Sequence, residues 1–483
     1  MRDENSRRGA FCDLAEGLRR SGGQSCFGGV EASTREAMQS LCAWGVAEID
    51  EAGFHLQPSW SVERLELFAP LLDMADLKIR DTSLPGCPVV LMAALADVPG
   101  PEWNETERSA VKLVSGGQGL DGGKALTSCL GEMAERLSLF SFGGHDPRVH
   151  IRKNSACETV AEAALGELLG FSARQEQDMT QTHPSLSDHL RDGQLDWNRI
   201  DERYVDLTDI RTGERVQAPA YGVLMGEGSG LGLGGLSLTS TCGTAVWSTW
   251  EGALRGAVQE LVERDAVGQL WYNRLGITCL ERPFWPGFIH RNCCQYLDER
   301  ERRTRFFIVD TDFRCHVVIA ISHERDGLGA CFGASVGCSV ADAAQSALGE
   351  MLQGEQSLGA MVRAHLSGNL DDSLPSAVRY ASTMRIADDL DFAAARSVDA
   401  VRLDLEFGED ELLNSCQENS IQLLAFDATR PDLKIPCVKV LSPDLCSWEP
   451  RFGKRRLYEG VVRRGWAQSE ADEGLFRARP FPF

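Results

Sequence analysis

The sequence Glu-x-x-Glu-Arg occurs twice, at residues 132–136 and 260–264, each time late in a long amphipathic helical pattern. Residues three apart share one face of a helix, so each copy carries two neighbouring carboxylates opposite an apolar stripe. The stripe has to be buried, whereas paired carboxylates are the oxygen ligands that a hard divalent cation needs. The fold must therefore bury one side of two helices while it keeps their acidic sides accessible, where together they could hold Mg²⁺ and a nucleotide.

Composition narrows the classes of protein that fit this chain. Its 483 residues are 43% hydrophobic and 25% charged, which is typical of a globular protein with two or three domains. The net charge of −22 argues against nucleic acid or an anionic membrane as the main partner, because both favour basic surfaces. We find no membrane-spanning pattern and no signal peptide. The 16 cysteines lack a Cys-x-x-Cys pair, so we expect reduced thiols in a cytoplasmic protein.

The first 70 residues are expected to form a separate segment. An early helix precedes a second one, which starts at the capping box of residues 33–36 and ends at Gly45, and a hairpin pattern follows at residues 46–56. Two helices and a two-stranded wing are the outline of a winged-helix-like module. The alternative is an irregular docking extension. Residues 1–60 carry a net charge of −3, which makes DNA reading an improbable role.

From about residue 75 to the end, strand-like runs alternate with helices, which predicts an α/β (α+β) body. We expect buried strands at residues 88–95, 306–309 and 316–321. Helices are expected near residues 122–140, 250–271 and 340–364.

Two further stretches of this body call for an interpretation. The polar residues 175–202 are interpreted as a surface loop or insertion. Residues 230–235 match G-x-G-x-x-G, but a strand pattern at 236–241 follows where a dinucleotide site needs a helix. The glycines are therefore interpreted as a tight loop leading into the sheet.

All three expected helices have one polar and one apolar face when drawn at about 100° per residue. The polar faces carry Ser128, Glu132 and Glu135; Glu260 and Glu263; and Ser346, Glu350 and Gln353. The apolar faces carry Leu126, Leu130, Met133 and Leu137; Leu254, Val258 and Leu261; and Ala344, Leu348 and Met351.

A single helix of this kind is most simply a surface helix with i,i+4 Glu–Arg pairs. Three similar faces favour another interpretation, in which they converge on one cavity. Four or more carboxylates there would repel one another unless divalent cations neutralised them. Such a cavity suits Mg²⁺-nucleotide and phosphoryl transfer, which needs metal, positioning and charge neutralisation.

These residues resemble the YcaO proteins, a family that includes the cyclodehydratases forming azoline rings in ribosomal peptides. Residues 128–136 match the family's first ATP motif, Ser-x-x-x-Glu-x-x-Glu-Arg, and residues 115–119 are similar to its Ser-Gly-Gly-Lys-Gly. Residues 253–274 resemble the second motif and residues 350–353 the third. The tail Pro-Phe-Pro-Phe at 480–483 is similar to the proline-rich C-terminus of azoline-forming members.

The resemblance implies a YcaO-type, Mg²⁺-dependent ATP enzyme over residues 75–483. In the implied reaction a Cys, Ser or Thr side chain of a precursor peptide attacks the preceding backbone carbonyl. ATP phosphorylates the resulting oxygen, and loss of phosphate leaves a thiazoline or oxazoline ring. Implied partners are the precursor peptide and a leader-binding protein, with an FMN-dependent azoline dehydrogenase as a further possible one.

The resemblance also implies roles for individual residues. The metal ligands would be Glu132, Glu135, Glu260 and Glu263. The ATP contacts would be Ser128, Arg136, Ser248, Glu260, Arg264, Glu350 and Gln353. The catalytic groups would be Glu132, Glu135, Glu263 and Phe483.

The chain departs from the family pattern at several positions. Gln118 stands in place of the usual Lys, and Ser346 stands where an Arg is common. Residues 248–253 read Ser-Thr-Trp-Glu-Gly-Ala instead of Asn-Thr-Leu-Glu-Glu-Ala, so a Glu is lost at Gly252. Glu251 lies about 180° from Glu260 around the helix and cannot easily replace it. We therefore expect one weakened metal site.

Two alternatives stay open at this point. The same ATP chemistry with sulfide or an amine as nucleophile would give a thioamide or an amidine, and the chain does not distinguish these. The departures from the motifs also agree with an ATP-deficient scaffold subunit of a peptide-modifying complex.

Overall fold

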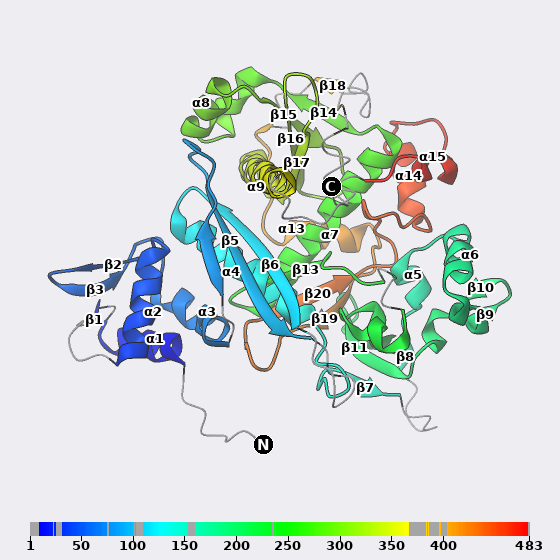
Figure 1. Ribbon diagram of the computed structural model, residues 1–483. Coiled ribbons are helices and arrows are strands. Elements are labelled where there is room, and N and C mark those ends of the chain that lie inside the picture. Colours follow the sequence, from blue (N-terminus) through cyan, green and yellow to red (C-terminus); the bar gives the residue numbers. More distant parts are fainter. Residues whose placement is uncertain are drawn as a thin grey trace.

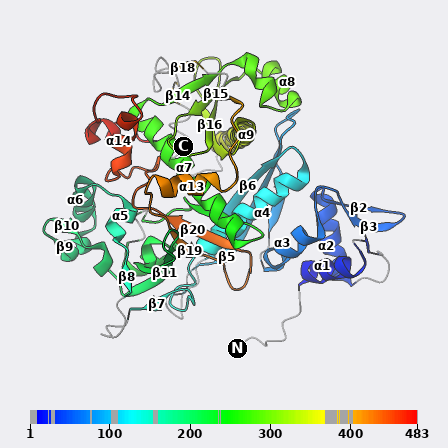
Figure 2. The same ribbon diagram turned by 180° about the vertical axis from the view of Figure 1, so that it is seen from behind.

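The computed structural model describes residues 9–22, 24–25, 31–74, 77–100, 102, 110–152, 160–233, 236, 238–366, 383, 385, 396–397 and 403–481. Figures 1 and 2 show a body of sheets and helices, with the N-terminal segment at one end and α6 (Ala173–Thr182) at the other. The expected α/β body is confirmed.

The N-terminal segment has the elements α1 (Ala10–Arg20), β1 (Gln24–Ser25), α2 (Ala32–Ala43), β2 (Ala47–Asp50), β3 (Gly53–Leu56) and α3 (Val62–Met74). Its strands form an antiparallel sheet in the order β1-β3-β2, and β2 and β3 are the expected hairpin. Helix α2 begins before the predicted capping box: its N-cap is Glu31, whose side chain makes no capping bond. This start was wrong by two residues, because tertiary packing of Ala37, Met38 and Leu41 sets the helix.

One hydrophobic core joins this segment to the body. It contains Leu18 and Met38 from the segment, Phe68 of α3, and Met92 and Met133 of the body. Helix α3 crosses the limit expected at residue 70. Because the core and helix α3 both continue across residue 70, the boundary between an N-terminal segment and the YcaO-type domain stays a prediction.

A three-stranded antiparallel sheet follows, made of β4 (Lys78–Asp81), β5 (Val90–Pro99) and β6 (Ala110–Gly119). Helix α4 (Gly122–Leu139) packs on it, and the Asp121 side chain caps the helix by accepting from Lys124 N at 2.8 Å. Gly117 of β6 allows the close approach, because a Cβ there would lie 2.2 Å from Cys129 N.

A five-stranded sheet has the order β17 (Cys331–Gly337), β16 (His316–His323), β15 (Arg303–Val309), β14 (Ile277–Leu280), β18 (Arg396–Ser397). Strand β16 is buried along its whole length, as its apolar run predicted. Helix α9 (Val340–Leu366) covers this sheet, with α8 (Arg291–Glu299) nearby (Figure 1).

A seven-stranded sheet forms the rest of the body. Its order is β13 (Thr244–Val246), β20 (Cys437–Leu441), β19 (Leu424–Asp427), β11 (Arg203–Asp209), β12 (Arg215–Pro219), β8 (Ala161–Glu162), with β7 (His150–Ile151) also pairing with β11. The long helix α7 (Trp250–Asn273) packs against β13, β20 and β17. The other α-helices of the described residues are α5 (Leu165–Leu169), α13 (Glu411–Glu418), α14 (Arg455–Arg463) and α15 (Glu473–Arg477).

Two expectations need correction. Of the two interpretations of residues 175–202, the surface loop was wrong, because these residues include most of α6, the short strands β9 (Leu190–Arg191) and β10 (Gln194–Leu195), and buried Leu186 and Trp197, while the insertion stays a prediction. Glu176, the buried acid of α6, accepts a hydrogen bond from Trp197 Nε1 at 2.6 Å, so polar residues here serve a small core. The strand expected at 236–241 is also wrong, since the strand after the glycines is β13.

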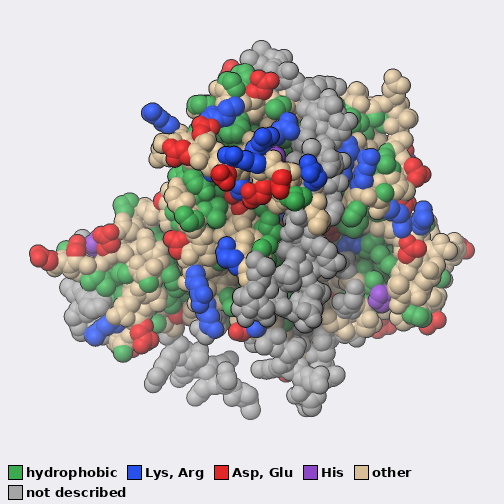
Figure 3. Space-filling view, turned by 45° about the horizontal axis from the view of Figure 1, so that its top comes forward, with side chains coloured by type: hydrophobic (Ala, Val, Ile, Leu, Met, Phe, Trp, Pro, Cys, Tyr) green, Lys and Arg blue, Asp and Glu red, His purple; other side chains and the backbone are tan. Residues whose placement is uncertain are grey.

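Two surface properties follow from this fold. Among the described residues, no helix is long and apolar enough to cross a membrane. Figure 3 shows a face on which acidic and basic side chains are interspersed, with a group of acidic side chains bordered by basic ones in its upper half. The net charge of −22 is therefore not expressed as one uniform acidic surface on this face.

Candidate functional site

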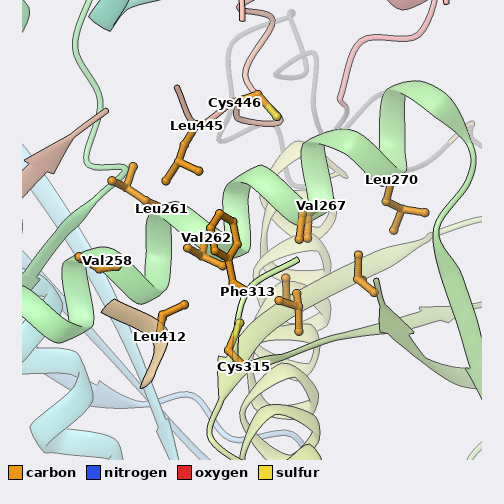
Figure 4. Packing of buried hydrophobic residues seen from close by; sticks show 14 of the residues in the cluster. Val258, Leu261, Val262, Val267, Leu270, Phe313, Cys315, Leu412, Leu445 and Cys446 are labelled. Carbon is orange, nitrogen blue, oxygen red and sulfur yellow. The ribbon is translucent and has the colours of Figure 1, made fainter. Parts of the chain in front are cut away.

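The apolar faces of α4, α7 and α9 are buried in three different cores, and all their predicted apolar positions are buried. Figure 4 shows Val258 and Leu261 of α7 in their core, together with Phe313, Leu412 and Leu445. Since each helix packs against a core of its own, its polar face is left free to meet the other two.

The polar face of α4 meets α9 at Gly116 of β6. Gly116 N donates to Glu132 Oε2 at 2.7 Å, and Arg136 Nε donates to Glu132 Oε1 at 3.0 Å. From α9, Gln353 lies over the same glycine, because a Cβ on Gly116 would be 1.9 Å from Gln353 Nε2. A residue with a side chain would separate the two helices here.

The polar face of α7 has the same arrangement. Glu260 Oε2 accepts from the backbone N–H groups of Gly243 and Thr244 at 3.1 and 3.2 Å, and its Oε1 accepts from Arg264 Nη2 at 2.7 Å. Glu263 is 6% exposed, and its Oε1 lies 3.5 Å from Arg264 Nη1. Glu260 and Glu263, the two carboxylates of the second Glu-x-x-Glu-Arg sequence, therefore both lie beside Arg264.

The third helix contributes Glu350, whose Oε2 accepts from Ala334 N at 3.2 Å. Two of the departures from the family pattern contact each other here, since Gln118 Nε2 donates to Ser346 O at 3.1 Å. The Gln118 amide also lies over Gly349, where a Cβ would be 1.1 Å from its Oε1. Gln118 thus connects β6 to α9.

The charges of these carboxylates influence one another across the three helices. Burial, together with repulsion from Glu260 and Glu132, raises the pKa of Glu135 well above its usual range. Burial, Glu350 and Glu260 do the same to the pKa of Glu263, against the opposing effect of Arg264. Loss of solvation, with smaller contributions from Glu260 and Glu132, raises the pKa of Glu350 to about 7, although the residue is exposed at the surface. These effects connect carboxylates of all three helices, in line with the contact that Gln353 of α9 makes over Gly116 beside Glu132 of α4.

Lys439 of β20 is a site residue that the sequence analysis missed. Its side chain is 2% exposed, and Nζ donates to the carbonyl oxygens of Ser240 and Cys242 at 2.6 and 3.1 Å. Burial lowers its pKa, while Glu260 and Glu135 oppose that effect. A lysine in the middle of the apolar run of residues 435–441 was the available signal.

The described end of the tail packs beside the second motif. Phe481 stacks on Trp448 at 4.7 Å and meets Trp271 edge-on at 5.3 Å, and Arg264 lies over the Trp448 ring at 3.6 Å. Phe483, which we predicted to be catalytic, lies outside the described residues.

The first turn of α7 explains how the chain tolerates Gly252. Trp247, which is 60% exposed, lies over this residue, and a Cβ on Gly252 would be 2.1 Å from Trp247 Cδ1. The indole thus occupies the space that a side chain at position 252 would need. Ser128, Ser248 and Glu251 are exposed, and the nucleotide roles predicted for the two serines stay predictions.

The donors at this site fit a divalent cation with a nucleotide. Carboxylate oxygens are the ligands that Mg²⁺ prefers, and a bound cation would stabilise the charged forms of Glu135 and Glu263, whose pKa values are raised by burial and by neighbouring carboxylates. Within the described ranges, no three acidic, histidine or cysteine side chains are grouped closely enough to hold an ion by themselves. Two cavities of about 800 and 850 Å³ lie elsewhere, and none of the predicted site residues lines them.

Comparisons with known proteins agree with this geometry. Residues 116–446 match the sequence model of a family described as YcaO cyclodehydratase, ATP- and Mg²⁺-binding. A heterocyclase in complex with substrate and cofactor is similar in structure, with a TM-score of 0.65 and 21% identity over 87% of this chain. The chain spans 56% of that heterocyclase, little more than half of its length.

Two further structures are similar. YcaO from Methanopyrus kandleri bound with AMPPCP and Mg²⁺ gives a TM-score of 0.51 at 16% identity, covering 77% of this chain and 85% of that one. A chain of the E. coli microcin synthetase McbBCD complex with pro-MccB17 bound gives 0.50 at 17% identity, covering 76% and 88%. No curated protein matches the chain. From the extent of the family match, the chain belongs to the YcaO family of ATP- and Mg²⁺-binding cyclodehydratases.

Proposed function

We propose that this chain activates backbone amides of a ribosomally made precursor peptide with Mg²⁺ and ATP, and so forms thiazoline or oxazoline rings. The observation that carries the proposal is the convergence of three acidic helix faces, in which Glu135 and Glu263 lie close to other carboxylates. The similar structures support the substrate class, because one is a heterocyclase with bound substrate and another is a microcin synthetase with pro-MccB17.

In this proposal the residues of the chain position and neutralise charge. When bound, Mg²⁺-ATP supplies the phosphoryl group that takes the amide oxygen away as phosphate. Glu135 and Glu263 face the cation, while Arg264 and Arg136 keep Glu260 and Glu132 oriented through the bonds described above. Gln353, lying over Gly116, is placed between α4 and α9 to contact the nucleotide.

The test is ATP hydrolysis and product mass with the precursor peptide, Mg²⁺ and the partner proteins. The wild-type chain should give loss of one water per ring. Glu135→Ala and Glu263→Ala should each lower turnover by about 100-fold or more, because each removes a charge that the transition state needs. Glu251→Ala on the exposed side of α7 is the matched control and should keep turnover. Unchanged turnover in both site variants would refute the assignment.

The mass of the product also decides between related reactions of the same site. A thioamide or an amidine would replace the lost water by sulfide or an amine that comes from outside the chain. If the product has no ring and carries one of these two mass changes, the chain forms a thioamide or an amidine instead of an azoline.

A scaffold role is the second candidate, and the pair Trp247 and Gly252 favours it. Trp247 fills the space where the family's second motif carries another acidic residue, which removes one oxygen ligand. Calorimetry with Mg²⁺-ATP separates the two functions. Micromolar affinity excludes a scaffold without ATP binding, whereas no binding even with partner proteins present would establish it.

Partners are part of the proposal. We expect a leader-binding protein to work with this chain, and the three-stranded N-terminal segment offers the exposed hairpin residue Ile49 as a place for it. A further proposed partner is an FMN-dependent dehydrogenase that oxidises the rings. The proposed location of the chain is the cytoplasm. Co-purification with proteins encoded by neighbouring genes tests all of these partners.

A further inference from the structure

One cavity of the molecule carries positive charge, in contrast to the acidic site. It has a volume of about 850 Å³ and crosses the end of β14, the start of β15 and the end of β16, which Figure 1 shows together at the top of the molecule. Among the described residues, seven arginines and four acidic residues line it, although the chain as a whole carries a net charge of −22. We name it the arginine groove, after side chains that include Arg282, Arg300, Arg302, Arg303, Arg305 and Arg325.

The back of the arginine groove is fixed by a carboxylate of α9. Glu355, whose side chain is 6% exposed, accepts a hydrogen bond from Arg300 Nη1 at 2.8 Å, and Arg302 Nε lies 3.3 Å from its Oε1. At about 100° per residue, Glu355 lies about 140° around α9 from Glu350. The groove is therefore on a different side of α9 from the acidic site.

Two arginines of the groove are ordered by aromatic rings. The Arg282 guanidinium lies over the Trp285 ring at 4.7 Å, and that of Arg305 lies over the Phe307 ring at 4.8 Å. Arg282 Nε also donates to Asp298 Oδ1 at 2.9 Å. A guanidinium held over a ring keeps N–H groups in its own plane, where they match the two oxygens of a carboxylate. A carboxylate bound here would thus meet donors that have already lost part of their freedom.

Two further arginines extend the positive charge to the surface. Arg303 is exposed and shares a face of β15 with Arg305, since side chains two apart in a strand point the same way. In the part of the chain that the structure describes, no acidic side chain pairs with Arg303. Arg325 is 71% exposed and lies 3.6 Å from Glu301, which is itself 84% exposed. An ion pair so open to solvent contributes little, so both cations are available to a ligand.

The floor of the groove is apolar. Leu280, Trp285, Leu297 and Phe306 are buried side chains that line it, and Trp285 meets Phe306 edge-on at 4.9 Å. A free phosphate would use the arginines but not this floor. A peptide segment in which acidic and apolar side chains are mixed would use both, through carboxylate–guanidinium pairs and through burial of apolar area. The volume of the groove is that of a large ligand site, which suits several residues of a peptide.

We propose that the arginine groove binds an acidic peptide segment of a partner protein, with apolar side chains between its carboxylates. Charge complementarity supports this step, because an acidic segment is repelled by the rest of an acidic chain and is held only where arginines gather. The same overall charge opposes nucleic acid as the occupant. The proposal goes beyond the proposed function and does not depend on it, since the groove lies on a different side of α9 from the acidic helix faces.

The test measures binding of a fluorescein-labelled peptide, Glu-Asp-Leu-Glu-Glu-Phe-Asp-Glu, to the full chain by fluorescence anisotropy. The peptide should bind, and its affinity should fall as salt is raised from about 50 to about 300 mM. Arg303→Glu and Arg325→Glu should each weaken binding about 5-fold or more, because each exchanges an attraction for a repulsion. The control is Arg174→Glu, at an exposed position of α6 at the other end of the molecule. It makes the same change in net charge and should keep the affinity within about 2-fold.

Two further comparisons separate the contributions of charge and of the apolar floor. A peptide with serine in place of leucine and phenylalanine should bind about 10-fold more weakly, because it loses apolar burial. Arg303→Gln should weaken binding in the same direction as Arg303→Glu, but by less. Each variant should keep the wild-type Tm, so that a loss of binding is not a loss of the fold.

Several outcomes would overturn the proposal. They are absence of peptide binding to the wild-type chain, and equal affinity of the wild-type chain, Arg303→Glu and Arg325→Glu. Displacement of the peptide by millimolar inorganic phosphate at constant ionic strength would make the groove a phosphate site instead. A dimer of the chain that Arg303→Glu dissociates, measured by sedimentation, would make a second copy the occupant.

Discussion

The guanidinium of Arg264 lies 3.6 Å from the centre of the Trp448 ring, on whose plane Phe481 stacks at 4.7 Å. Arg264 is also the cation that binds Glu260 through Nη2 at 2.7 Å. Trp448 therefore connects the second acidic motif to the tail of the chain and adds aromatic side chains to a site made mainly of charged groups. The same tail is anchored by Trp271 Nε1, which donates to Arg479 O at 2.8 Å.

Replacing Trp448 by leucine should weaken Mg²⁺-ATP binding about 3- to 30-fold, because a cation–π contact contributes about 0.5–2 kcal/mol. Arg264 would lose the surface that orients it toward Glu260 and Glu263. Calorimetric titration measures the change in Kd. Phenylalanine at position 448 keeps a π face and should recover most of the affinity. Equal affinity of the leucine variant and the wild-type chain would contradict an orienting role.

Glutamate at position 252 should destabilise the chain on its own. A Cβ there would lie 2.1 Å from Trp247 Cδ1, so the indole or the first turn of α7 must move. Trp247→Ala, at a residue that is 60% exposed, should cost little, about 0.5 kcal/mol or less. The double variant should lose less free energy of unfolding than the two single variants lose together, by about 1 kcal/mol or more. Urea unfolding of all four chains measures this coupling, and additive effects would contradict the contact.

The parts of the site that the sequence predicted are those encoded by local periodicity. The apolar faces of α4, α7 and α9, and the placement of Glu135, Glu263 and Glu350 on the opposite faces, follow from a 3.6-residue repeat, which each helix carries within its own sequence. The alternation of strands and helices likewise indicated the α/β body. The resemblance to the YcaO motifs predicted the type of fold and the binding of ATP.

The parts that the sequence did not predict depend on contacts between distant residues. Lys439 reaches the carbonyl of Ser240 across 199 residues, and no local pattern marks that pair. The small core around Trp197 turned a polar stretch into ordered structure, because Glu176 is bonded inside it. The unequal hydrogen bonding of Glu132 and Glu135 was also invisible, since the strand residues that donate are not part of the helical repeat.

The metal-free chain should lose a small part of its stability as the pH rises from about 5 to about 7, because loss of solvation raises the pKa of Glu350 from 4.5 to about 7 while solvent still reaches this residue. The folded state then holds a proton that the unfolded state has released, so unfolding becomes easier through this window and the effect levels off above it. Glu135 and Glu263 add to it in the same direction. Urea unfolding in EDTA measures the slope, which Glu350→Gln should reduce. By the same linkage, Mg²⁺-ATP should bind more tightly toward about pH 8. A slope unchanged in the variant would contradict the assignment to Glu350.

Methionine at position 439 should destabilise the chain and disturb Glu260 at the same time. The Lys439 ammonium holds the carbonyls of Ser240 and Cys242, while Glu260 holds the next N–H groups of the same loop, at Gly243 and Thr244. Loss of the amine leaves two part-buried carbonyls without this donor, at up to about 1–3 kcal/mol each.

The Lys439→Met variant also removes a positive charge that acts on Glu135 and Glu260, so Mg²⁺ should stabilise it more than it stabilises the wild-type chain. Thermal unfolding with EDTA and with Mg²⁺ measures both effects. Lys434→Met, at an exposed lysine in the segment that leads into β20, is the control and should change neither. If Mg²⁺ raises the Tm of Lys439→Met and of the wild-type chain equally, Lys439 only anchors the loop. A larger rise in the variant would show that its charge balances the carboxylates when the cation is absent.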